Sequence, residues 1–277
     1  MVQNIGYMFS KGLYRSIKNG MIVEKAVQDQ NVMESKSRKI LEINPFKQES
    51  DASAFQAMCM PQYAVNPGGA VTAFELNVLY PGLYSGIGNA HGTGDMPFGE
   101  DGRRQPDKDF KLGFAFDYTT GLPYVPGSGV KGALRACFID QTQDVLQALK
   151  EVLGSEKEIE KKVLLAVETA IFGNRSGDPD CQQQGCVIFH DAFPASGDAP
   201  VMAEDYITPH PAGRAPNPIR TIKIRPGTRM RFAFEMPERI CAGGMEIERE
   251  KLKELFSRLL VDWGVGAKTH TGYGNLL

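Results

Sequence analysis

The sequence has little excess charge and no long apolar run. Its 277 residues carry a net charge of −2, which argues against binding to nucleic acid by general electrostatic attraction. The apolar runs are far shorter than a membrane span, and the first residues lack a secretory signal pattern. We therefore expect a cytoplasmic protein without membrane contact, in which any RNA binding depends on local patches or backbone amides.

Cysteine is sparse, and its spacing does not suggest a disulfide framework. The five cysteines, an odd number, are scattered along the chain, which is typical of reduced thiols in a cytosolic protein. Cys181, Cys186 and His190 could begin a zinc site, but a second convincing ligand pair is missing. The sequence predicts no metal and no cofactor, with a metal at Cys181 and Cys186 left open.

Hydrophobic periodicity predicts an α+β fold. Residues 1–70 are expected to form a helical N-terminal extension, and residues 71–277 the main domain. In that domain, strand and helix patterns alternate in the order of a ferredoxin-like (RRM-like) βαββαβ core with inserted helices and loops. The predicted elements are a strand at 71–80, a helix from Ser128, two further helices, strands at 186–193 and 229–235, a helix at 252–263 and a strand at 273–277. Residues 81–112 read as a long inserted loop.

One candidate phosphate site is the glycine-rich segment that begins the predicted helix near Ser128. Ser128 is a suitable N-cap, and Gly127 leaves backbone donors accessible. Lys131 and Arg135 are four residues apart and therefore share a helix face. The alternative is an ordinary capped helix with two solvated basic residues.

A second candidate is the glycine-rich loop 264–274. It is not a P-loop, because Ala267 replaces the glycine that must precede the lysine and no helix follows. Such a loop can still press its backbone against a phosphodiester chain, with a lysine adding charge and a tyrosine stacking on a base. The expected RNA-binding residues here are Gly266, Lys268, Thr269, His270, Gly272 and Tyr273. A tight turn that serves folding alone is the alternative.

The segment 220–231 is locally basic and contains no acidic residue. Strand alternation places Arg229 and Arg231 opposite Met230 and Phe232, so the two arginines are further RNA-binding candidates. A solvated sheet face explains them equally well.

The histidines do not form a recognisable catalytic pair. A metal-independent ribonuclease needs a histidine as general acid or base, and His91, His190, His210 and His270 show no such spacing. We predict no catalytic residue. An endoribonuclease using His91 or His270 remains the second hypothesis, and a scaffold that contacts only protein remains the third.

Two motifs together resemble the RAMP superfamily of CRISPR proteins. They are LPYVPGSGVKGALR at 122–135 and GVGAKTHTGYG at 264–274, in that order. The segments 171–173, 185–193, 205–210, 216–219 and 226–228 narrow the resemblance to the family of the sixth subunit of the Cmr module, a type III-B effector.

The resemblance implies a non-catalytic subunit that binds guide (CRISPR) RNA in antiviral defence and caps the backbone filament near the 3′ region of the guide. The implied neighbours are the repeated backbone RAMP, the small helical subunit and the head RAMP, with target RNA bound in the assembled complex.

Overall fold

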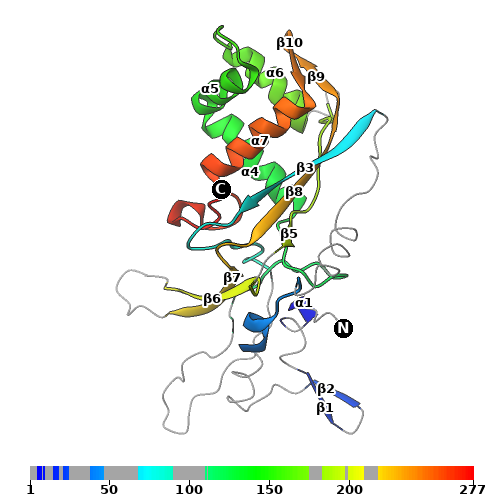
Figure 1. Cartoon of the computed structure of the whole chain (residues 1–277), viewed down its shortest axis with the longest axis vertical. Coiled ribbons are helices and arrows are strands. Elements are labelled where there is room, and N and C mark those ends of the chain that lie inside the picture. Colours follow the sequence, from blue (N-terminus) through cyan, green and yellow to red (C-terminus); the bar gives the residue numbers. More distant parts are fainter. Residues whose placement is uncertain are drawn as a thin grey trace.

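The computed structural model in Figure 1 describes part of the chain. The described residues are 5–7, 9, 15–18, 21–24, 38–46, 68–89, 110, 112–174, 183–196, 199–208 and 218–277. His91, His210, Cys181 and most of the predicted loop 81–112 lie outside them. The mixed helix and antiparallel sheet content confirms the α+β class.

The central sheet is built around β8 (Arg229–Pro237). β3 (Gly69–Asn77) pairs with it along one side, antiparallel over the whole strand. On the other side, β8 pairs with β4 (Ile188–Phe189) and then with β5 (Phe193–Ser196). The predicted last strand is reduced to an antiparallel bridge between Leu276 and Val78, beyond the end of β3.

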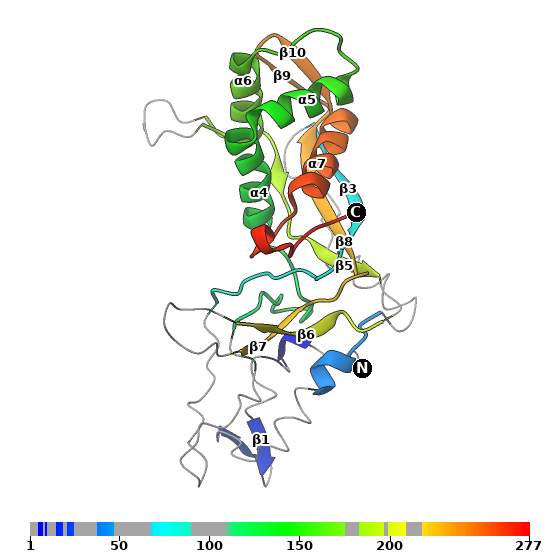
Figure 2. The ribbon, with the colours of Figure 1, turned by 90° about the vertical axis from the view of Figure 1, so that its left-hand side faces the viewer.

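Helices cover one face of this sheet. They are α4 (Gly127–Asp140), α5 (Thr142–Leu153), α6 (Lys161–Phe172) and α7 (Arg249–Trp263). Figure 2 shows α4 and α7 on the same side of β3 and β8. No helix in the described ranges is long and apolar enough to cross a membrane.

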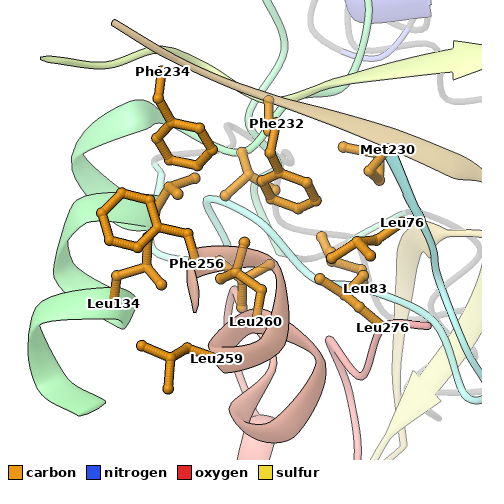
Figure 3. Packing of buried hydrophobic residues seen from close by; sticks show 14 of the residues in the cluster. Leu76, Leu83, Leu134, Met230, Phe232, Phe234, Phe256, Leu259, Leu260 and Leu276 are labelled. Carbon is orange, nitrogen blue, oxygen red and sulfur yellow. The ribbon is translucent and has the colours of Figure 1, made fainter. Parts of the chain in front are cut away.

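Aromatic side chains join the helices to the sheet. Along β8, Phe232 and Phe234 point toward α7, as the alternating pattern predicts, and both are fully buried. The ring of Phe256 in α7 lies 5.2 Å from that of Phe234 and 5.8 Å from that of Phe189. Leu134 of α4 completes this part of the core (Figure 3).

The remaining strands form three hairpins. They are β1 (Arg15–Lys18) with β2 (Met21–Glu24), β6 (Met202–Ile207) with β7 (Ile219–Ile224), and β9 (Arg239–Ala242) with β10 (Met245–Glu248).

Residues 1–70 were predicted to be mostly helical. Their described part contains the short helix α1 (Ile5–Tyr7), a helical turn at 38–42 and the β1–β2 hairpin. The sequence signal for this hairpin is Asn19-Gly20, because Asn-Gly favours two-residue hairpin connections.

The aromatic cluster generates a stability prediction. Phe256→Ala should lower the free energy of unfolding by about 3–5 kcal/mol, because it leaves a cavity against three other rings. Leu165→Ala in α6 is the control, since that side chain is 54% exposed, and its effect should stay within about 0.5 kcal/mol. Urea denaturation measures both, and equal losses would contradict the packing described here.

Candidate nucleic-acid interface

The start of α4 borders a groove of about 610 Å³. The groove lies against β4 and the end of β8, and its lining comprises Gly69, Gly127, Ser128, Lys131, Gln184, Gly185, Cys186, Val187, Ile188, Phe189, Glu235, Met236 and Pro237. Three of the predicted RNA-binding residues, Gly127, Ser128 and Lys131, therefore share one concave surface.

The helix start differs from the prediction in its cap. α4 begins at Gly127, its N-cap is Pro126 without a side-chain capping hydrogen bond, and Ser128 therefore lies within the helix. Instead, the Gly127 N–H donates to the Asp191 carboxylate at 2.6 Å, so a residue distant in sequence satisfies this helix-end donor. Ser128 is exposed at the groove.

Gly127 is required by packing. A Cβ atom built there would lie 2.2 Å from the carbonyl oxygen of Phe189, so only glycine lets the helix start approach β4 this closely. Farther along α4, a Cβ at Gly132 would meet nothing within 4 Å. The helix backbone at Gly132, which follows Lys131 in the sequence, is therefore not covered by other described residues.

Lys131 and Arg135 have different surroundings. The Lys131 ammonium lies 5.9 Å from the Phe189 ring centroid and makes no ion pair with a described residue. The Arg135 guanidinium instead donates to the buried Glu168 carboxylate at 3.1 Å and to the Gly173 carbonyl at 2.8 Å. Arg135 thus ties α4 to α6, while Lys131 remains available to an anion in the groove.

The C-terminal loop folds back on residues 82–84. The Ala267 N–H donates to the Tyr84 carbonyl at 2.9 Å, and the Gly274 N–H donates to the Gly82 carbonyl at 2.8 Å. Gly266 has φ +97°, and a Cβ there would lie 2.4 Å from the Tyr84 oxygen. The close approach that this glycine permits is therefore to the chain's own backbone.

The outer part of the same loop is accessible. Lys268 and His270 are exposed, and Thr269 and Gly272 are partly buried. Lys268 has φ +62°, and among the described residues other than glycine no further positive φ occurs. A positive φ costs free energy for any residue with a Cβ atom, and such residues are often found where function requires the conformation.

Tyr273 is held by a polar network. Its hydroxyl donates to the Asp205 carboxylate at 2.6 Å, which also accepts from the Lys223 ammonium at 2.8 Å and from the Tyr84 hydroxyl at 3.2 Å. The Tyr273 ring lies 4.6 Å from the Tyr84 ring and 5.6 Å from the Lys223 nitrogen. The ring predicted to stack on a base is therefore partly buried against Tyr84 and Lys223.

The ionisation of this network follows from its contacts. Burial by itself raises the pKa of Asp205, but hydrogen bonds from Lys223 and Tyr273 outweigh burial and hold the pKa below its usual range. Burial and the hydrogen bond to Asp205 raise the pKa of Tyr273 to about 12. At neutral pH Asp205 is therefore a carboxylate and Tyr273 is neutral.

Arg229 and Arg231 lie on the sheet face away from the helices, as the alternation predicts. Both approach the Glu75 carboxylate on β3, at 3.7 and 3.5 Å. Their charge is therefore partly compensated, and neither side chain lines the α4 groove.

Sequence reasoning missed Asp191, Asp205 and Lys223 as organising residues. Asp205 and Tyr273 are 68 positions apart, so no local motif joins them. The histidines give no catalytic arrangement in the described part of the chain: His270 is exposed, and partial burial lowers the pKa of His190. Within the same ranges, no three His, Cys, Asp or Glu side chains converge on a metal position.

Comparison with known proteins defines the class. The model of the RAMP superfamily matches residues 75–276, so the chain belongs to the RAMP superfamily. Within the superfamily it resembles Cmr6. It is 29% identical to CRISPR system Cmr subunit Cmr6 of Pyrococcus furiosus, over 57% of this chain and 58% of the relative. It is 30% identical to the Cmr6 subunit of Saccharolobus solfataricus, over 44% of this chain and 36% of the relative.

A solved structure has a related fold. A chain in the cryo-EM structure of the type III-B Cmr-beta complex bound to cognate target RNA superposes with a TM-score of 0.52. The match covers 89% of this chain and 71% of that chain, at 19% identity. The present chain spans less than two thirds of the length of the curated relatives that it matches.

The Asp205 network should make stability depend on pH. The pKa of Asp205 is lower in the folded chain than in the unfolded chain. The ionised carboxylate therefore contributes fully to the free energy of unfolding above the unfolded-state pKa of about 3.9, and this contribution is lost as the pH falls through the folded-state pKa. In the Asp205→Asn variant, the free energy of unfolding should therefore fall less steeply than in the wild type as the pH drops below ~4. Urea denaturation across this range measures it, with the exposed Asp262→Asn as control.

Proposed function

We propose that this chain is a non-catalytic, guide-RNA-binding structural subunit of a type III-B CRISPR effector complex that targets RNA. In this proposal it caps the backbone filament near the 3′ region of the guide. Its neighbours are the repeated backbone RAMP, the small helical subunit and the head RAMP. The observation that carries the proposal is the RAMP match over residues 75–276 together with the resemblance to two Cmr6 subunits.

The sheet order supports a ferredoxin-like core within this proposal. The C-terminal segment, β3, β8 and β4 lie in that sequence across the sheet, with α4 and α7 on one face. The chain order of these elements is strand, helix, strand, strand, helix and terminal segment, which is the split βαβ arrangement.

The α4 groove is the strongest RNA contact that the described residues offer. Ser128 is exposed beside the helix start, and Lys131 adds a positive charge. Glu235 also lines the groove, so an anion is best placed at Ser128 and Lys131, away from that carboxylate. Because the Gly127 N–H already binds the Asp191 carboxylate, the proposed phosphate contacts come from Ser128 and Lys131, and such contacts position the RNA without reading its sequence.

The absence of catalysis belongs to the same proposal. Acid–base cleavage of RNA needs two correctly placed proton-transfer groups. In the described ranges His270 is exposed on the C-terminal loop, whereas His190 is half-buried and its ring Nε2 has no hydrogen-bond partner. The proposal therefore assigns neither histidine a catalytic role.

Purification with partner subunits tests the function. When the tagged chain is co-expressed with the other subunits and a CRISPR array, the complex should retain RNA of discrete length. The purified chain should not cut single-stranded RNA, with or without Mg²⁺ or Mn²⁺. Absence of bound RNA would contradict the guide-binding role, and cleavage lost in His270→Ala would favour the endoribonuclease.

The groove assignment makes a sharper prediction. Lys131→Ala should weaken binding of the assembled complex to guide RNA by about threefold to tenfold, because one phosphate contact is lost. For the same reason, the slope of the logarithm of the binding constant against the logarithm of salt concentration should decrease in magnitude by about one. Lys150→Ala removes the same charge from α5, where Lys150 pairs with Glu158, and should leave affinity nearly unchanged. Filter binding over a salt series measures both variants; equal effects would remove the groove from the interface.

A further inference from the structure

Within the described part of the chain, β3 is an edge strand along most of its length. One side pairs with β8, whereas the described residues cover the opposite side only at its end. There the Asn77 N–H donates to the Leu277 carbonyl at 2.7 Å, and the Leu277 N–H donates to the Asn77 carbonyl at 2.9 Å. Just beyond the strand, the Leu79 N–H donates to the Asn275 carbonyl at 2.9 Å.

These hydrogen bonds fix which β3 residues face outward. Successive residues of a strand direct their N–H and C=O groups to opposite sides. Because Asn77 faces the C-terminal segment, Val71, Ala73 and Glu75 direct their backbone groups to the same outer edge. Among the described residues, these outward groups have no backbone hydrogen-bond partner. Proteins usually pair or cover such a row.

A groove of about 510 Å³ lies beside this edge, between α5 and α7. It is lined by Phe74, Glu151, Val152, Lys253, Glu254, Ser257 and Arg258. The charges at its rim are compensated by neighbours on the protein: Arg258 pairs with Glu151, Lys253 with Glu250, and Glu254 with Lys251. The groove therefore calls for an apolar side chain that contacts Phe74 and Val152, not for a complementary charge.

We propose that an extended segment of a neighbouring protein adds to the sheet as a strand along the outer edge of β3. Its backbone pairs with Val71, Ala73 and Glu75, and one of its apolar side chains enters the groove beside Phe74. Alternating donors and acceptors at strand spacing match a polypeptide backbone. A ribose–phosphate chain offers phosphate acceptors without that alternation. Only the identity of the neighbour, another subunit of the effector complex, rests on the proposed function.

Hydrogen exchange resolved to single residues tests the pairing. In the isolated chain, the amides of Val71, Ala73 and Glu75 should exchange fast, and those of Thr72 and Phe74, which face β8, should exchange slowly. In the assembled complex, the three outward amides should become slow. Slow exchange already in the isolated chain, fast exchange in the complex, or protection by guide RNA alone would each overturn the inference.

Substitutions at the edge give an independent readout. Ala73→Pro removes one outward N–H and leaves the bonds to β8, and proline is tolerated on edge strands in this orientation. It should weaken association with the partner subunits by about tenfold or more, whereas Ala73→Ser, which keeps the N–H, should not. Equal affinity for both variants contradicts the proposal.

Two further arms keep the test decisive. If Ala73→Pro unfolds the chain, Ser257→Trp, which fills the groove, must weaken association while Ser257→Ala does not. If no subunit associates with the chain, the proposed function fails, and the edge is tested alone with a library of displayed linear peptides. The wild-type chain must then select peptides that Ala73→Pro does not bind; selection of none, or equal binding by both, overturns the inference.

Discussion

The contact between α7 and the central strand β8 organises the molecule. Phe256 packs on Phe234, and Phe189 of β4 packs on Phe256. Since β8 pairs with β3 on one side and with β4 and β5 on the other, this aromatic cluster fixes the helices against the whole sheet. Phe189 also lies beneath the Lys131 ammonium, and the C-terminal loop begins where α7 ends. Both candidate RNA contacts are thus positioned by the same core.

Elements with a strong periodic signal could be predicted from the sequence, and short polar strands could not. β3, α4, β8 and α7 bury one regular stripe of large side chains, which the spacing of apolar residues reveals. The β6–β7 hairpin is different, because Arg220 and Lys223 suggest a solvated basic patch. In the structure they pair with Glu204 and Asp205 across the hairpin. Such pairing depends on tertiary neighbours that a local pattern does not contain.

The candidate site shows the same limit at the level of side chains. The sequence located the glycine-rich helix start, where Gly127, Ser128 and Lys131 do share a groove. It could not show that Arg135 binds Glu168 in another helix, or that Gly266 packs on the Tyr84 carbonyl. Glycine and arginine serve equally well for ligand contact and for internal packing. Only the neighbouring atoms distinguish the two uses.

If the chain binds RNA as proposed, its distribution of charge connects that binding to assembly. Many basic side chains in the described ranges pair with carboxylates of the same chain. Few basic side chains therefore remain available to bind phosphate, and Lys131 and Lys268 are two of them. A few contacts on a chain of net charge −2 hold RNA weakly, because affinity grows with the number of phosphates neutralised. In the proposed function, strong guide binding therefore requires neighbouring subunits that bind the same RNA, since linked sites reinforce one another. Surfaces that join this chain to other proteins, such as the docking edge proposed for β3, would therefore strengthen RNA binding without touching RNA.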